Sequence, residues 1–338
     1  MTTAPPLPAS DPAATFKAAK ILITGGFGLI GSAVARRLVA AGAEVRILDN
    51  LDPDSGASRA NLEGLEDRIE AVIGDIRDPD LVRRALSDRD VLFNLAAQTS
   101  HLGSMQAPLA DLDVNARAQL ALLEAARVLN PRLRIVFAST RQIYGKPDYL
   151  PVDERHPLRP VDVNGIDKLA GEAFHLLYHR VHGLRTTALR LTNTYGPGMR
   201  IRDARQTFVG VWLRAVLEDR PFELWGGEQQ RDFTYVEDAA DAFLLAAATP
   251  ATEGGVYNIG GDGTVTLKDL AETLVAAHGR GSFVLKEFPP ERKAIDIGDY
   301  WADDATFRRM TGWRPQVGIR PGLEKSLDFF RTRLAKYV

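Results

Sequence analysis

The chain has 338 residues, enough to bury a large core, and its 45% hydrophobic and 25% charged residues are typical of a globular protein. A net charge of −2 gives no electrostatic case for nucleic acid or an anionic membrane as the main partner. Because there is no cysteine, disulfides, thiolate metal sites and cysteine nucleophiles are excluded, which suits a reducing compartment, and we expect the cytoplasm.

The first sixteen residues, MTTAPPLPASDPAATF, are rich in proline and alanine and lack both a basic start and a continuous apolar stretch. We therefore expect residues 1–16 to be a disordered tail rather than a signal peptide. No run in the chain reaches the length of a membrane-spanning helix.

A strand, a glycine turn, a helix and a second strand follow one another over residues 20–50. Gly26, Gly28 and Gly31 fit the pattern G-x-G-x-x-G, and Gly25 adds a further turn glycine. Such glycines let the backbone approach a pyrophosphate, whose charge the start of the helix attracts, here at Leu29 and Ile30.

Asp49 ends the second strand of this unit, eighteen residues after Gly31. A carboxylate at this place can accept hydrogen bonds from the adenosine ribose hydroxyls, and it would repel a 2′-phosphate. The sequence therefore predicts bound NAD rather than NADP. A glycine turn that serves only packing is the alternative.

Strands and helices then alternate along the chain. We expect strands at Ile69–Ile73, Val91–Ala96, Leu133–Ser139 and Thr186–Leu191, and helices at Pro79–Leu86, Leu109–Leu129 and Val163–His182. Strands separated by helices indicate a doubly wound parallel sheet, so the predicted fold class is α/β, with a Rossmann-like NAD-binding domain over residues 17–191.

The second half is less regular. We expect a strand at Val256–Ile259 and helices at Phe208–Leu217, Val236–Ala248, Leu267–His278 and near Gly322–Leu334. This pattern predicts a smaller α/β C-terminal substrate-binding lobe over residues 192–338, with part of residues 231–260 packing against the first domain. His175, His179 and His182 lie at helical spacing, but without a carboxylate or glycine signature we interpret them as a polar face and expect no metal.

Several motifs occur in order along nearly the whole chain. They are TGGFGLIG (Thr24–Gly31), the acid Asp49, GDI (Gly74–Ile76), NLAAQ (Asn94–Gln98), STRQIYG (Ser139–Gly145), NGIDK (Asn164–Lys168), RLTNTYGPG (Arg190–Gly198) and RDFTYVEDAADA (Arg231–Ala242). Over about residues 20–333 this set resembles the extended short-chain dehydrogenase/reductase superfamily, in its nucleotide-sugar epimerase/dehydratase branch.

The resemblance implies roles for residues around NAD. Asp75 and Ile76 would lie beside the adenine, and Lys168 would hold the nicotinamide ribose. The other residues implied along the cofactor are Asn50, Leu95, Ala96, Ala97 and Gln98. These roles are chemically sensible, since a carboxylate can bond the adenine amino group and an ammonium can donate to two hydroxyls.

The resemblance also implies a nucleotide-diphosphate sugar as substrate. Asn193 and Arg231 would lie near its diphosphate, with Arg292 as a third candidate, because an arginine fork matches phosphate geometry. Phe222, Leu224 and Trp225 would enclose the nucleobase, and Ser100, Thr140 and Arg200 are further substrate-binding candidates. The alternatives are a surface ion pair for Arg231, plain core for Trp225, and a solvated loop for the cluster Arg200, Arg202 and Arg205.

The active centre of the family couples a Ser/Thr with Tyr-x-x-x-Lys, whose tyrosine exchanges the proton of a sugar hydroxyl. This chain keeps Lys168 but has Asn164 four residues before it. A carboxamide cannot act as a base at any ordinary pH, so another group must act or the step must differ. The candidates are Thr140 at the Ser/Thr position, His101, whose residue type titrates near neutrality, Tyr144 and Lys168 itself.

The neighbouring residues narrow the reaction. Dehydratases of this branch resemble one another in having Thr-Asp-Glu where this chain has Thr140-Arg141-Gln142, so the acid and base that expel water are missing. We therefore expect an NAD-dependent epimerase, acting at C4 through a keto intermediate. A dehydratase or lyase with an unusual base, or a redox-poor protein that binds NAD or a sugar nucleotide, are the alternatives.

The expected helices Leu109–Leu129 and Val163–His182 carry apolar residues that suit an isologous interface, and in relatives the equivalent pair forms a four-helix bundle. These residues are Leu120, Leu123, Phe174, Leu177 and Tyr178. The resemblance thus implies a homodimer, although the same side chains could equally cover the sheet.

Overall fold

The computed structural model of the protein describes residues 11–338 except positions 53, 206 and 294. Its centre is a seven-stranded parallel sheet in the order β11-β6-β5-β4-β1-β2-β3. The strands are β1 (Lys20–Thr24), β2 (Glu44–Asp49), β3 (Ile69–Ile73), β4 (Val91–Asn94), β5 (Arg134–Thr140), β6 (Arg185–Leu191) and β11 (Val256–Ile259). The predicted Rossmann-like, doubly wound α/β fold is confirmed.

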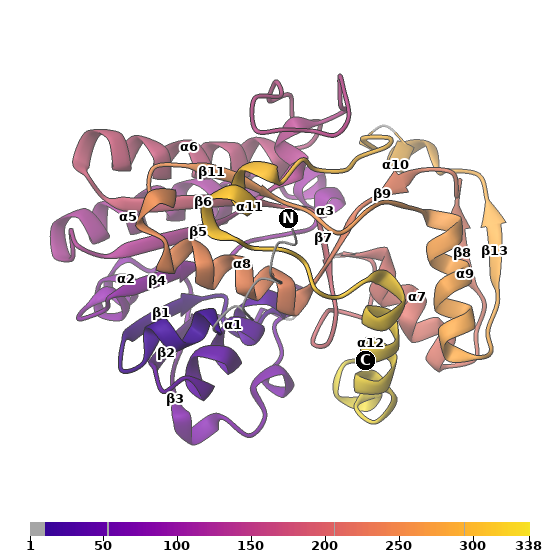
Figure 1. The fold of residues 1–338 in the computed structure, drawn as a ribbon, viewed down its shortest axis with the longest axis horizontal. Coiled ribbons are helices and arrows are strands. Elements are labelled where there is room, and N and C mark those ends of the chain that lie inside the picture. The colour runs from indigo at the N-terminus through magenta and orange to yellow at the C-terminus, as the bar shows by residue number, and fades with distance from the viewer. Residues whose placement is uncertain (1–10, 53, 206, 294) are drawn as a thin grey trace, which may run out of the picture.

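Helices cover both faces of this sheet (Figure 1). One face packs on α1 (Leu29–Ala40) and α8 (Val236–Ala248), and the other on α2 (Pro79–Leu86), α5 (Ala118–Leu129) and α6 (Val163–His182). In buried strands such as Val91–Asn94, buried and exposed residues do not alternate, because helices cover both faces of the parallel sheet.

The order of the strands reverses between β1 and β4, which is where a doubly wound sheet binds its ligand. The carboxyl ends of these two strands carry the glycine loop and the segment Leu95–Gln98. The fold therefore places these two motifs, seventy residues apart, side by side.

The smaller lobe packs around its own core and lies on the right of Figure 1. Its helices are α7 (Phe208–Leu217), α9 (Leu267–His278), α10 (Pro290–Lys293) and α12 (Ile319–Arg331). Its strand pairs are β8 (Phe222–Trp225) with β13 (Phe283–Lys286), β9 (Gln230–Arg231) with β12 (Val265–Thr266), and β7 (Asn193–Tyr195) with β10 (Phe233–Tyr235).

The chain crosses between the lobes more than once after residue 191. Strand β11 completes the main sheet beside β6, and α8 packs on α1. Phe307, on α11 (Ala305–Thr311), and Trp313 also lie in the core of the first lobe, although we had assigned them to the second. A single boundary at residue 191 is therefore too simple.

The described end of the expected tail is structured. Residues Pro12–Phe16 form a 3₁₀ turn, and the Phe16 ring lies edge-on to Phe93 at 6.3 Å. Asp11 accepts a hydrogen bond from the Arg37 guanidinium at 2.6 Å. The prediction of disorder is thus wrong for residues 11–16, because an aromatic side chain there joins the core, while residues 1–10 lie outside the described part.

The expected long helix Leu109–Leu129 is divided. It consists of α4 (Pro108–Leu112), a π-helical turn (Asp113–Arg117) and α5. The π turn widens the helix at Asn115, whose amide donates to the Gln98 carbonyl at 3.0 Å. Such turns are frequent at functional sites, and this one contacts the segment beside the switch point.

No helix of the described residues is long and apolar enough to cross a membrane.

Candidate active site

The loop after β1 can be built only from glycine at its key positions. Gly25 has φ +69°, and a Cβ there would lie 2.9 Å from the Ala96 backbone. A Cβ at Gly31 would lie 2.2 Å from the Gly25 carbonyl oxygen. The positive φ of the turn therefore falls at Gly25 rather than Gly26, while a Cβ at Gly26 would lie 2.6 Å from the Ile47 side chain.

The start of α1 is open to an anion. Gly28 is the N-cap of this twelve-residue helix and offers no side chain to its N–H groups, which begin at Leu29 and Ile30. A helix N-terminus of this kind, beside backbone that a Cβ would block, fits a pyrophosphate. The residues present thus fit the diphosphate of NAD.

We call the glycine loop, the start of α1, Asp49, Asp75 and the segment Leu95–Gln98 the cofactor cradle. Its two acidic residues are held in defined positions. Asp49 accepts the Phe27 N–H at 2.9 Å and the Leu51 N–H at 2.8 Å, so it ties the end of β2 to the glycine loop. Burial raises the pKa of this carboxyl, and the two N–H donors oppose that rise. Each oxygen keeps a further lone pair for a ribose hydroxyl.

Asp75 belongs to the same edge. The Asn50 amide donates to it at 2.9 Å, and the Arg77 guanidinium, which contributes most, lowers its pKa to about 2. It is therefore a carboxylate at neutral pH. Ile76 beside it is buried in the core.

A threonine fixes the turn after β4 against the glycine loop. The Thr24 hydroxyl donates to Asn94 at 2.9 Å and accepts the N–H groups of Leu95 and Ala96 at 3.0 and 3.2 Å. The segment Leu95–Gln98, which includes Ala97, is partly exposed along this edge. It follows that small residues leave room there for a cofactor.

Lys168 lies buried in α6 and is aimed at the end of β5. Its ammonium donates to the Ala138 carbonyl at 2.8 Å and lies 4.9 Å from the centre of the Phe137 ring. Burial lowers its pKa to about 8. An ammonium has three N–H donors, so two remain for the hydroxyls of a nicotinamide ribose.

Asn164 is buried and used for structure. Its amide donates to the Gln98 carbonyl at 2.8 Å and to Asp111 at 3.2 Å. Its backbone N–H donates to the Ser104 hydroxyl at 3.1 Å. The Asn164 side chain therefore ties α6 to the switch-point segment and α4.

Asn164 adjoins a buried acidic pair that we had not singled out. Burial and the neighbouring Asp111 raise the pKa of Asp167 to about 7. Part of the Asp167 population is therefore protonated near neutral pH, and this reduces the charge buried beside Asp111.

Tyr144 is not placed to transfer protons to a substrate. It is fully buried, its hydroxyl donates to Asn258 at 2.7 Å, and it accepts from Arg190 at 2.7 Å. Burial raises its pKa to about 12. Our candidate role for Tyr144 is thus wrong, because the residue belongs to the core.

Thr140 and His101 are better placed. Thr140 ends β5, is partly exposed and accepts the Gln142 N–H at 3.2 Å, which leaves its own hydroxyl proton free to be donated. His101 begins the short helix α3 (His101–Gln106), which Ser100 caps by accepting the Gly103 N–H at 3.0 Å. Ser100 therefore holds α3 and keeps its own hydroxyl proton free to be donated.

Two arginines meet at the boundary of the lobes. Arg231 is buried, and its guanidinium contacts Asp296 at 3.0 Å. Burial, followed by the charge of Arg141, lowers its pKa to about 10, so it remains a cation at neutral pH. Arg231 is accordingly not the surface ion pair that we had considered.

Arg141 is the residue that sequence reasoning missed here. Its Nη2 donates to Asn193 at 2.9 Å, while its Nη1 is buried without a hydrogen-bond partner among the described residues. The guanidinium also lies 5.4 Å from the centre of the Tyr300 ring. A buried guanidinium with a spare donor fits an anionic group.

The other residues predicted to bind the substrate lie in different environments. Phe222 stacks on Trp212 with ring centres 4.9 Å apart, and Leu224 is fully buried, so both belong to the lobe core rather than a nucleobase site. Trp225 is partly exposed. Arg200 chelates Asp203 at 2.8 and 2.6 Å and is largely neutralised, and the Arg292 side chain lies outside the described part.

The histidines of α6 do not form one polar face. His175 is fully buried and stacks on Phe137 at 4.2 Å, and burial lowers its pKa to about 4. The described residues contain no cluster of three groups able to hold a metal ion.

Residues 21–260 match the sequence model of the NAD dependent epimerase/dehydratase family. The chain belongs to this family. It is an NAD-dependent enzyme of nucleotide-sugar chemistry.

Relatives of the family extend over almost the whole chain. The UDP-glucose 4-epimerase of Mycolicibacterium smegmatis is 32% identical over 318 residues, covering 93% of this chain and 99% of that protein. An epimerase structure from Methanothermobacter thermautotrophicus superposes with a TM-score of 0.90 at 26% identity, covering 96% of each chain. The UDP-glucose 4-epimerase of Thermotoga maritima with UDP-glucose gives 0.85 at 29% identity, covering 93% and 99%.

Proposed function

We propose that the protein interconverts the C4 epimers of a nucleotide-diphosphate sugar through a keto intermediate. The observation that carries this proposal is the combination of Thr140 and Lys168, retained around the cofactor cradle, with Arg141 and Gln142 in place of the dehydratase acids. Gln142 donates to the buried Asp162 at 2.9 Å and is no acid. Without an acid–base pair at these two positions, loss of water from the sugar is disfavoured.

The chain's own residues would divide the work. NAD, when bound, would supply the acceptor and the donor for the C4 hydride. Thr140 would bond the C4 oxygen, and Lys168 would hold the nicotinamide ribose in register with it. Arg231, Arg141 and Asn193 would retain the diphosphate while the keto sugar turns, which uses binding energy remote from the reacting carbon.

The test is direct. Purified protein is incubated with UDP-, GDP-, CDP- and dTDP-hexoses and uronic acids, while the sugar protons are followed by NMR and NADH by absorbance. We expect one C4 epimer pair to equilibrate without lasting NADH. Release of a 4-keto-6-deoxy sugar would instead indicate a dehydratase, and saturable binding without turnover a binding protein.

Arg141→Met tests the anion site. Losing a charge-assisted hydrogen bond of about 1.5–3 kcal/mol should raise the dissociation constant of the nucleotide sugar by ~10–100-fold. Titration calorimetry with the substrate found above measures this, and Arg309→Met, an exposed arginine on α11, is the matched control. Unchanged affinity in Arg141→Met would remove Arg141 from the substrate site.

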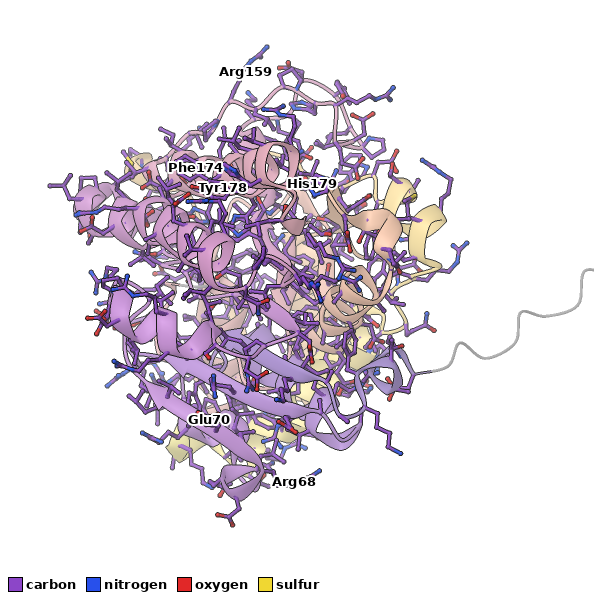
Figure 2. The ribbon with its side chains drawn as sticks, turned by 90° about the vertical axis from the view of Figure 1, so that its left-hand side faces the viewer. Arg68, Glu70, Arg159, Phe174, Tyr178 and His179 are labelled. Atoms are coloured by element: carbon purple, nitrogen blue, oxygen red, sulfur yellow. The ribbon has the colours of Figure 1, made fainter. Side chains whose placement is uncertain are left out.

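A homodimer remains our proposal for the assembly. Of the interface candidates, Leu123 and Tyr178 are buried in the core, so they cover the sheet instead. Figure 2 shows Phe174 and Tyr178 on the same side of α6. Apolar side chains that stay exposed on α4, α5 and α6 are Leu109, Leu112, Val128, Leu129, Ile166, Leu177 and Val181.

For the compartment we propose the cytoplasm, which the lack of cysteine suits.

Introducing charge on this face should separate the subunits. We expect wild-type protein to sediment as a dimer at micromolar concentration and the double variant Leu109→Asp/Ile166→Asp as a monomer, since a buried unpaired carboxylate is costly. Val284→Asp, at an exposed apolar position on β13, is the control and should stay dimeric. A monomeric wild type would contradict the proposal.

A further inference from the structure

His101 pairs with a buried carboxylate. Its Nδ1 lies 2.9 Å from Asp162 Oδ2, and the Asp162 side chain has no exposed surface. The contact lies at ion-pair distance, and the Nδ1 of His101 makes no hydrogen bond with the described residues. A histidine held at Nδ1 by a buried acid presents Nε2 as the proton acceptor.

Asp162 is itself fixed from two further sides. As the N-cap of α6 it accepts the Gly165 N–H at 2.7 Å, and the Gln142 amide donates to it at 2.9 Å. Burial raises the pKa of the Asp162 carboxyl, but the His101 ring and these donors outweigh burial and hold the pKa below its usual value. The residue is therefore a carboxylate at neutral pH.

The imidazole has one free side. About a third of the His101 side chain is exposed (36%), and its Nε2 has no partner among the described residues. Gln142 connects Asp162 to Thr140, the residue proposed to bond the C4 oxygen. Its side-chain amide donates to Asp162, and its backbone N–H donates to the Thr140 hydroxyl. Hydrogen bonds thus link Thr140 to Asp162 through Gln142, and the ion-pair contact adds His101 to this group.

The groups that would otherwise transfer the proton are engaged elsewhere. Asn164 is bonded to Gln98 and Asp111, and Tyr144 is sealed in the core. On the elements packed against α3, the charged groups are Asp111 on α4 and Asp167, Lys168, Glu172 and Arg180 on α6, with Arg141 interacting with Asp162 from the end of β5. Among the described residues, Asp162 is the ionisable group that contacts the His101 ring.

We propose that His101 Nε2 replaces the missing tyrosine as the acid–base group, with Asp162 and Gln142 as positioning residues. This inference rests on the proposed epimerisation. His101 Nε2 would accept the proton of the C4 hydroxyl as the C4–O bond becomes a carbonyl, and NAD, when bound, would supply the acceptor for the C4 hydride. On return of the hydride to the other face, Nε2 gives the proton back to O4, so protons and electrons balance.

His101→Ala should lower kcat by ~10²–10⁴-fold with the substrate found for the wild type, the range typical of general acid–base catalysis. The binding of NAD and of the nucleoside diphosphate of that substrate, measured by calorimetry, should be unchanged. Added imidazole should restore part of kcat, which a structural role would not allow. His182→Ala, an exposed histidine on α6, is the matched control and should retain wild-type kcat.

The pH profile assigns the proton. When His101→Ala is assayed without added imidazole, its pH profile of kcat should lack the acid limb that the wild type shows. The variant is needed because Asp167, with its pKa raised to about 7, titrates in the same range. Asp162→Asn keeps the helix cap but favours the wrong imidazole tautomer, so it should lower kcat by ~10²-fold or more.

Two results have distinct meanings. A wild type that epimerises while His101→Ala keeps its kcat and its acid limb would overturn the role of His101 alone. A wild type that epimerises no nucleotide sugar would overturn the proposed function, and the role of His101 with it.

Discussion

Lys168→Met is expected to lower kcat by ~10²–10⁴-fold. The ammonium is buried, spends one donor on the Ala138 carbonyl and has two left for the ribose. Each hydrogen bond from a charged donor is worth about 1.5–3 kcal/mol, and methionine fills similar volume without any. Steady-state kinetics on the epimer pair measure the loss.

The pKa of Lys168 also predicts that kcat falls at alkaline pH. Because burial lowers its pKa to about 8, the cation is present below that pH and is lost as the pH rises through it. Activity should therefore fall above about pH 8 in the wild type. Lys325→Met, at an exposed position on α12, should leave both kcat and this fall at alkaline pH unchanged. Full activity of Lys168→Met would remove the residue from catalysis.

Glu172→Ala should destabilise the fold by about 3–5 kcal/mol, the cost of leaving a buried charge unpaired. Glu172 and Arg190 contact each other at 2.5 and 3.0 Å, with side chains 2% and 4% exposed, and the Ser139 hydroxyl donates to the same carboxylate at 2.6 Å. Arg190 also supports Tyr144. Removing Glu172 therefore strands an arginine inside the active-site lobe.

Urea denaturation measures this effect, with Asp328→Ala as the control. Asp328 pairs with Arg331 at 2.6 Å on the surface of α12, where an ion pair is worth about 1 kcal/mol or less. If Glu172→Ala lowered the free energy of unfolding by less than about 1 kcal/mol, the prediction would be wrong, and the interior would reorganise around Arg190.

Local signals explain why much of the fold was predictable. The helix Val163–His182 was expected with the bounds it has, because Asp162 caps its start and Gly183 adopts the left-handed conformation at its end. The helix Val236–Ala248 and the strand Val256–Ile259 were equally regular in their apolar pattern. The glycine loop and Asp49 predicted the cofactor because its chemistry demands those residue types at that spacing.

What remained hidden depends on contacts between distant segments. His101 and Asp162 are sixty-one residues apart, and nothing local indicates that α3 and the start of α6 meet. Sequence reasoning made Tyr144 a candidate base because it could not show that Tyr144 is buried. The residues that contact its hydroxyl, Asn258 and Arg190, lie on other strands far away in the sequence. The π turn at Asn115 and the packing of Phe16 likewise depend on partners that periodicity cannot reveal.

The most direct test of the central claim uses the nucleotide sugar deuterated at C4. If hydride leaves C4 and returns to the other face of the same carbon, the epimer formed should carry the deuterium at C4, with none in solvent, as NMR and mass spectrometry can establish. Deuterium found at C6, or exchanged into water, would contradict epimerisation through a 4-keto sugar.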